Sequence, residues 1–258
     1  MKIQRKYGCL KDKRFKLDRI YRPTPRAVQQ FPAAFDLGAT PNPAFGLLNQ
    51  GELGSCTGFG LKRLAWYGLN SHGHTVEPSA LFIYYCERLL ENDVAEDNGA
   101  SISDGIDALL KYGVCPEADW PYIVSKFAQP PPESAFTDAL NFQALVKERI
   151  NTDSNLVQNI KDALFNQRLP VVFGADVFPG FESDAAMATG LVPMPASGDS
   201  PLGGHCMVIR GWNNNAQDGP RFKIANSWGS AGDNGCMWLL FQYLQQFSSD
   251  LWAIPQME

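Results

Sequence analysis

Apolar residues recur at helical spacing in the first half of the chain. After Cys56 the apolar stripe consists of Phe59, Leu61, Leu64, Ala65, Tyr67 and Leu69. This spacing is that of a helix with one buried face, so it predicts a helix that begins at or next to Cys56. Residues 79–92 and 102–111 predict two more helices, and Tyr112-Gly113 ends the second of these.

Short apolar runs dominate the second half. Residues 142–150 alternate loosely, and continuous apolar runs predict buried strands at 171–177, 207–212, 221–225 and 237–241, with a helix at 156–166. Helices followed by strands predict an α+β fold with two lobes. A proline-rich breaker at 129–133 is the predicted linker, which gives a mostly helical lobe at 33–130 and a mostly β lobe at 131–258. Residues 1–32 are polar and basic, and predict an extended N-terminal arm.

Composition and charge narrow the function classes. With 45% hydrophobic and 19% charged residues, the composition is that of a globular protein. A net charge of −5 and the lack of a dense Lys/Arg block argue against a nucleic-acid partner. No stretch approaches the roughly 20 apolar residues of a membrane span, and the basic start lacks the apolar core of a signal peptide. We therefore expect a cytoplasmic protein with no membrane partner, with export by another route as the alternative.

The basic residues cluster between Lys2 and Arg26, where a solvated arm is a simpler interpretation than a phosphate-binding or membrane-binding patch. The six cysteines are Cys9, Cys56, Cys86, Cys115, Cys206 and Cys236, and no two form a CxxC pair. A zinc ribbon is therefore not predicted, and we expect no metal, no cofactor and few or no disulfides. His72 and His74 lie in a polar turn, and exposed loop histidines are a simpler interpretation there than a metal site.

The candidate chemistry begins with Cys56 and His205. A cysteine at a helix N-terminus has its thiolate stabilised by the helix dipole and by free N–H groups. His205 is one of only three histidines, follows Gly203-Gly204 and opens an apolar strand. Histidine is the most frequent catalytic base, so this pair predicts an activated thiol nucleophile. Taken singly, each residue also fits a structural role.

Two amide side chains complete the candidate site. Asn226 follows the strand 221–225 and can accept a hydrogen bond from an imidazole, which Trp228 can shield from water. Gln50 lies six residues before Cys56. Its side-chain N–H groups and the backbone N–H of Cys56 can stabilise the oxyanion of a tetrahedral intermediate.

These blocks together resemble the papain family of cysteine peptidases. The block Asn-Gln-Gly-Glu-Leu-Gly-Ser-Cys at 49–56, Gly-Gly-His at 203–205 and Asn-Ser-Trp-Gly at 226–229 match the family's three blocks in order. The His and Asn lie 149 and 170 residues after the Cys. The likeness extends over most of residues 32–245 and is similar to bacterial peptidases of the xylellain type.

The resemblance implies a papain-like two-lobe fold, with a helical lobe, an antiparallel β-sheet or barrel lobe, and the active site in the cleft between them. It implies a hydrolase, a thiol protease that cleaves a peptide or protein substrate through an acyl-enzyme. It places Gly99 and Ala100 on the rim that pairs with the substrate backbone. It places Ala175 and Gly203 near the main side-chain pocket, and Trp228 on the substrate-binding surface.

The chain also departs from the family pattern. Leu53 stands in place of a cysteine whose partner near Gly99 is also missing, so the usual disulfide beside the site is absent. Thr57 replaces an aromatic residue at a position that can line the cleft. The loop 229–235 lacks a second tryptophan, so we expect a more open leaving-group side. Cys206 replaces an alanine, and its thiol is expected to be buried beside the site.

The arm at 1–32 resembles a short pro-segment, which predicts a zymogen whose own N-terminus lies in the cleft; a disordered tail is the alternative. No extra blocking loop is evident, which favours an endopeptidase. Two other function classes stay open. One is a cysteine-dependent acyltransferase or transglutaminase, which uses an amine in place of water. The other is a catalytically silent binding protein with a papain fold.

Overall fold

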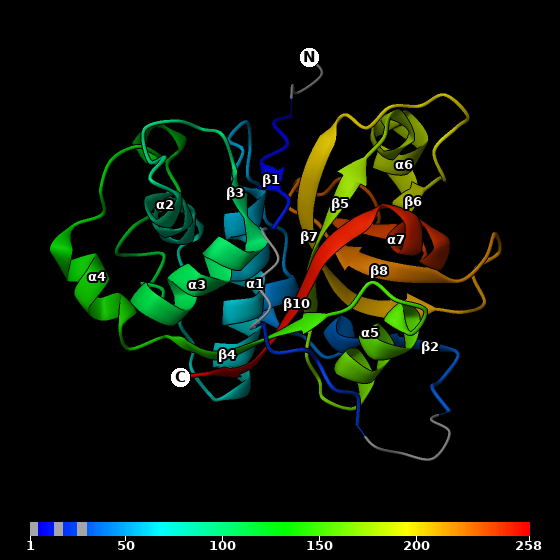
Figure 1. Ribbon diagram of the computed structural model, residues 1–258, viewed down its shortest axis with the longest axis horizontal. Coiled ribbons are helices and arrows are strands. Elements are labelled where there is room, and N and C mark those ends of the chain that lie inside the picture. Colours follow the sequence, from blue (N-terminus) through cyan, green and yellow to red (C-terminus); the bar gives the residue numbers. More distant parts are fainter. Residues whose placement is uncertain (1–4, 13–17, 25–29) are drawn as a thin grey trace.

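The computed structural model describes residues 5–12, 18–24 and 30–258 (Figure 1). Its α-helices are α1 (Cys56–Ser71), α2 (Ala80–Glu91), α3 (Ile102–Tyr112), α4 (Glu133–Ala139), α5 (Leu156–Phe165), α6 (Asp184–Thr189) and α7 (Phe241–Phe247). Four short 3-10 turns are η1 (Leu37–Ala39), η2 (Pro43–Phe45), η3 (Val124–Lys126) and η4 (Pro179–Glu182). The strands are β1 (Cys9–Leu10), β2 (Ala34–Asp36), β3 (Ala100–Ser101), β4 (Ala144–Ile150), β5 (Val171–Val177), β6 (Leu191–Val192), β7 (Gly203–Asn213), β8 (Arg221–Ala225), β9 (Cys236–Leu240) and β10 (Ser248–Met257).

The three helices expected in the first half are confirmed, and local capping explains their ends. The Ser79 hydroxyl accepts a hydrogen bond from Phe82 N–H at the start of α2, and Asn92 ends this helix in the left-handed conformation. The Ser101 hydroxyl caps α3 in the same way, and Gly113 follows it. Side-chain oxygens at these N-caps satisfy backbone N–H groups that have no partner within the helix.

The β lobe is built on one eight-stranded sheet. Seven of its strands follow the order β4-β10-β5-β7-β8-β9-β6, and the eighth, β2, pairs with β7. Neighbouring strands are antiparallel except for the β6–β9 pair. The α+β two-lobe prediction is confirmed: α2, α3 and α4 gather on one side of Figure 1 and the sheet on the other. Helix α1 lies between them and packs against β7 and β10 as well as α2 and α3. The lobe boundary at residue 130 stays a prediction.

Several elements differ from the sequence prediction. The strand expected at 207–212 begins four residues earlier, so His205 lies inside β7 and not at its mouth. Helix α4 begins at Glu133, the last residue of the predicted linker. The last ten-residue strand, β10, carried no prediction, although it occupies the sheet between β4 and β5. Its register is interrupted against both neighbours, which weakens the periodic signal that a regular strand leaves in a sequence.

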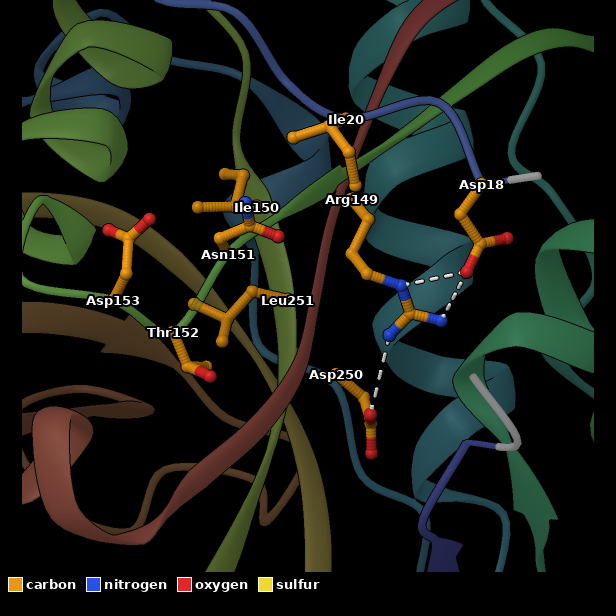
Figure 2. Close-up of a pocket in the computed structure, with 9 residues that line it drawn as sticks. All are labelled: Asp18, Ile20, Arg149, Ile150, Asn151, Thr152, Asp153, Asp250 and Leu251. Carbon is orange, nitrogen blue, oxygen red and sulfur yellow. Dashed lines mark hydrogen bonds and ion pairs between the residues drawn. The ribbon is translucent and has the colours of Figure 1, made fainter. Parts of the chain in front are cut away.

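The described residues of the N-terminal arm pack against the body, contrary to the expectation of a solvated arm. Strand β1 pairs in parallel with β3. Further along, Tyr21 is buried, and its N–H donates to the carbonyl of Arg149 on β4 at 2.8 Å. Figure 2 shows the guanidinium of Arg149 held between Asp18 of the arm and Asp250 of β10, at the edge of a cavity of about 330 Å³. This cavity contains none of the four candidate catalytic residues.

Candidate active site

Cys56 is the first residue of α1 and is completely buried. A close approach between α1 and the sheet brings it to the β lobe: a Cβ on Gly60, one turn further on, would lie 2.6 Å from the sulfur of Cys206. The backbone N–H of Cys206 donates a hydrogen bond to the Cys56 sulfur. The thiol of one lobe therefore touches the residue directly after His205 of the other lobe.

His205 and Asn226 are brought together by the pairing of β7 with β8. Nε2 of His205 lies 2.8 Å from Oδ1 of Asn226, and this oxygen also accepts a hydrogen bond from the N–H of Ser227. Because an amide oxygen only accepts, the proton of the neutral imidazole lies on Nε2 and Nδ1 carries the lone pair. Nδ1 has no hydrogen-bond partner among the described residues. Trp228 stacks on the imidazole with 4.7 Å between ring centroids, as its shielding role requires.

Gln50 is held on the same side of the cleft as Asn226. Its Oε1 accepts a hydrogen bond from the hydroxyl of Ser227 at 2.6 Å, and its Nε2 donates to the carbonyl of Leu53 at 3.0 Å. One Nε2 hydrogen is left over, because an amide nitrogen has two. The side chain that could complete an oxyanion hole is thus fixed at its oxygen end by the residue that follows Asn226.

The covered site holds its thiol and imidazole in their neutral forms. Burial raises the pKa of the Cys56 thiol far above its ordinary value. Burial also lowers the pKa of His205 to about 4, against an opposing effect of the hydrogen bond to Asn226. Low-dielectric surroundings disfavour the charged form of each group, so coverage by the arm opposes the formation of a thiolate–imidazolium pair.

The arm covers Cys56 with its backbone. The N–H of Gly8 donates to the Cys56 sulfur, and the carbonyl of Gly8 accepts from the N–H of Ala100 at 2.8 Å. A Cβ on Gly8 would lie 1.7 Å from the carbonyl oxygen of Gly54, and a Cβ on Gly99 would lie 2.0 Å from the carbonyl oxygen of Gly8. Only backbone without side chains fits at this crossing.

The five expected substrate-binding residues all lie along this covered strip. Gly99 and Ala100 contact Gly8 as described, and a Cβ on Gly203 would lie 2.5 Å from the Cβ of Tyr7. Ala175 lies opposite His205 in the β5–β7 ladder and is buried. Trp228 lies under the guanidinium of Arg5, with 4.1 Å from Cζ to the ring centroid. The surface expected to take a substrate is therefore occupied by residues 5–10.

The structure shows the setting of two departures from the family pattern, Thr57 and Cys206. Thr57 does not line the cleft, because it is buried and its hydroxyl donates to the Glu87 carboxyl inside the helical lobe. Cys206 is buried as expected, and its thiol is in hydrogen-bond contact with that of Cys9 from the arm. All six cysteines are free.

Sequence reasoning missed three residues that support the site. Tyr122 donates to the carbonyl of Gln50 at 2.8 Å and lies 2.6 Å from the hydroxyl of Ser55. The buried Arg63 of α1 donates to the carbonyl of Asn226 at 2.7 Å. Arg63 could have been found from the sequence, because a charged residue inside an apolar helix needs buried hydrogen-bond acceptors. Ser227 lies within the Asn-Ser-Trp-Gly block but was given no role of its own.

The described residues contain neither a group that could bind a metal ion nor a helix that could span a membrane. Within residues 5–12, 18–24 and 30–258, no three His, Cys, Asp or Glu side chains are grouped so that they could hold a metal ion. His72 is exposed, and its Nδ1 lies 2.9 Å from the carbonyl of Gly68. No described helix combines the length and hydrophobicity needed to cross a bilayer.

Comparison with known proteins places this geometry in a family. No family model matches the chain. A peptidase C1-like protein of Acanthamoeba polyphaga mimivirus is 35% identical over 98% of this chain and 88% of its own length. The crystal structure of xylellain, a cysteine protease from Xylella fastidiosa, superposes with a TM-score of 0.88 at 30% identity, over 98% of this chain and 96% of xylellain. A procathepsin B of Trypanosoma congolense shares the fold, with a TM-score of 0.71 at 15% identity and coverage of 98% and 86%.

The chain belongs to the papain-like (C1) cysteine peptidases. Both the viral relative and the bacterial protease extend over nearly the whole chain, so the family assignment covers the two lobes together with the arm. The protein is accordingly a papain-like thiol protease, as the three sequence blocks indicated.

Proposed function

We propose that Cys56, His205, Asn226 and Gln50 carry out peptide-bond hydrolysis through an acyl-enzyme, and that residues 5–10 restrain this activity. The observation that supports the catalytic assignment most is the contact of Cys56, at the start of α1, with Cys206, the residue directly after the His205 that pairs with Asn226 in the β lobe. The unpaired Nδ1 lone pair of His205 is the group that can accept the Cys56 proton. The Nε2–Asn226 hydrogen bond holds the ring in that orientation.

The reaction proceeds in two steps once the arm has left. Solvation of the cleft favours transfer of the Cys56 proton to Nδ1 of His205, and the thiolate attacks the peptide carbonyl carbon. The leftover N–H of Gln50 and the backbone N–H of Cys56 stabilise the oxyanion. His205 then gives its proton to the leaving amine, and the acyl group remains on Cys56 as a thioester. In the second step His205 takes a proton from water, and the resulting hydroxide releases the carboxylic acid and restores Cys56.

We infer endopeptidase action from the path of the arm. Residues 5–10 run continuously past Cys56, from Arg5 at Trp228 on one side to Leu10 at Ser101 on the other. A cleft that admits an extended chain on both sides of the nucleophile suits cleavage within a polypeptide. The six free thiols suit a reducing compartment, and we keep the cytoplasm as the proposed location.

The catalytic assignment is tested with a fluorogenic peptide and an epoxide thiol inhibitor under reducing conditions. Wild type should hydrolyse the peptide and be labelled at Cys56, and Cys56→Ala should do neither. Cys86→Ala, which removes another buried thiol, is the matched control and should keep both activities. Gln50→Ala should lose about 2.7–4 kcal/mol of transition-state stabilisation, measured as kcat/KM.

Two outcomes would contradict the peptidase mechanism. If wild type neither cleaves the peptide nor reacts with the epoxide, the silent binding protein becomes the better interpretation. If product forms only when a primary amine is supplied, the acyltransferase or transglutaminase interpretation replaces hydrolysis.

A further inference from the structure

Glu182 faces the arm beside the catalytic imidazole and has no role in the mechanism above. It ends η4, and its side chain is 18% exposed. Its described contacts all come from the arm: Nη1 of Arg5 lies 3.5 Å from Oε1, and the hydroxyl of Tyr7 donates to the same oxygen. When the arm withdraws, this carboxylate loses both partners. The side chains of Glu182, Trp228 and Met187, which together surround Arg5, are here called the recess.

The guanidinium of Arg5 is enclosed by three different chemical groups. Besides the contact with the Glu182 carboxylate, Cζ of Arg5 lies 4.1 Å from the centroid of the Trp228 ring. Nη2 of Arg5 lies 3.7 Å from the sulfur of Met187. A carboxylate, an aromatic face and a polarisable sulfur together suit a planar cation. The Arg5 side chain is only 16% exposed, so the recess takes up most of it.

The recess lies next to the catalytic imidazole of His205. Trp228 stacks against His205 on one side, while its ring also contacts Arg5. Phe181, the residue before Glu182, packs edge-on against Trp228 with 5.5 Å between centroids and fixes the indole. A cationic side chain in this recess is therefore one aromatic ring away from the general base. Trp228 directly precedes the loop 229–235, which the family resemblance places on the leaving-group side of the cleft.

We propose that Glu182 and Trp228 form a subsite that selects peptides with an arginine or lysine side chain on the leaving-group side of the scissile bond. In the covered enzyme, Arg5 of the arm occupies this subsite. The proposal rests on the proposed peptidase function and adds a substrate class to it. Arginine should be preferred to lysine, because its flat guanidinium can stack on the indole while pairing with the carboxylate.

The test uses the full-length Arg5→Ala variant, in which the arm no longer supplies its own cation. Peptides that differ only at the leaving-group position carry Arg, Lys, Gln or Glu there. We expect kcat/KM for the Arg peptide to exceed that for the Gln peptide by about 10- to 30-fold, from the combined cation–π and ion-pair contributions. Adding Glu182→Gln should reduce this ratio to about threefold or less, whereas the matched control Glu77→Gln, at an exposed carboxylate that pairs with the buried Lys62, should leave it unchanged.

Epoxide labelling of Cys56 in the same samples separates the two proposals. Equal kcat/KM for the Arg and Gln peptides, in enzyme that is labelled at Cys56, would overturn the subsite and leave the peptidase intact. If no variant is labelled, the catalytic assignment fails. The subsite is then tested by measuring how strongly the arm is protected from protease in Arg5→Ala, in Glu182→Gln and in the double variant. Non-additive losses support the contact, and strictly additive losses overturn it.

Discussion

Residues 5–10 and residues 18–24 belong to the same arm but contact the body by different chemistry. Residues 5–10, the cleft segment, contact the catalytic thiol through backbone groups: the carbonyl of Gly8 accepts from the N–H of Ala100, and the N–H of Gly8 donates to the Cys56 sulfur. Its side chains add the partly exposed ion pairs Arg5–Glu182 and Lys6–Asp97. Residues 18–24, the outer segment, are held by buried side chains. Asp18 pairs with Arg149, and the Tyr21 hydroxyl donates to Asp162 at 2.5 Å.

The difference assigns separate tasks to the two segments. The cleft segment covers the catalytic thiol with Gly8, which has no side chain, and on either side of it buries Cys9 and packs Tyr7 against the core. The outer segment lies against β4 of the sheet, away from the cleft, and its ion pairs keep the arm attached (Figure 2). We therefore expect that coverage of the site and attachment of the arm can be changed independently by single substitutions.

The largest effect is expected for Arg149→Met, which breaks the attachment. Arg149 is the cation between Asp18, Asp250 and the buried Asp12, whose distances to its nitrogens are 2.8, 3.5 and 3.5 Å. Removing one partner of a buried charge cluster costs about 3–5 kcal/mol. Thermal unfolding should show this loss, and limited proteolysis should cut the outer segment. Lys147→Met on the same strand, next to the exposed Asp107, is the control; equal stability of the two variants would contradict this role of Arg149.

Gly8→Ala should open the cleft while leaving the outer segment attached. The new methyl group would lie 1.7 Å from the Gly54 carbonyl oxygen only when the arm is docked. Such overpacking costs about 1–3 kcal/mol, which corresponds to roughly 5- to 150-fold weaker docking. Peptide turnover should rise accordingly, with unchanged protection of residues 18–24. Unchanged turnover would show that the cleft segment does not restrain the enzyme.

Docking of the arm should weaken as pH rises from about 4 to about 6, because of Asp12. Burial, together with the nearby Asp250 carboxylate, raises the pKa of Asp12 to about 6 from 3.8, against hydrogen bonds from Ser103 and Trp252 and the charge of Arg149. The docked arm therefore binds this proton more tightly than the released arm, so protonation favours docking. Between about pH 5 and pH 6.5 docking should weaken roughly tenfold. The rate of epoxide labelling in wild type, divided by that in Asp12→Asn, should rise over this range; a flat ratio would exclude Asp12.

Lys11→Ala should have the smallest effect and serves as the matched control for Gly8→Ala in the arm. Lys11 is 72% exposed and lies 3.8 Å from the Asp176 carboxylate. Exposed pairs of this kind contribute about 0–1 kcal/mol. Turnover and proteolysis should stay close to those of wild type. A large rise in turnover would mean that charge, and not the fit of Gly8, holds the cleft segment down.

The helices of the first half of the fold were predictable from local signals, and the candidate catalytic residues were proposed from three short sequence blocks. The stripe after Cys56 gave α1, and the side chains of Ser79 and Ser101 marked the starts of their helices. The order of the Cys, His and Asn blocks led to a site that the structure brings together. Strand β10 and helix α4 were not predicted, because β10 has an interrupted register and α4 has only seven residues.

The sequence by itself predicted the two lobes, an arm that lies in the cleft, the four candidate catalytic residues and the lack of the usual disulfide at Leu53. Only the tertiary structure decided which residues of the arm cover Cys56, that Thr57 faces the interior and that Glu182 pairs with Arg5. The physical reason is distance along the chain. Periodicity and capping act within a few residues, whereas Gly8 meets Gly99 and Arg5 meets Glu182 through packing between segments that share no local pattern. The basic residues of the arm therefore predicted a solvated segment, because the sequence does not show the distant residues that they contact.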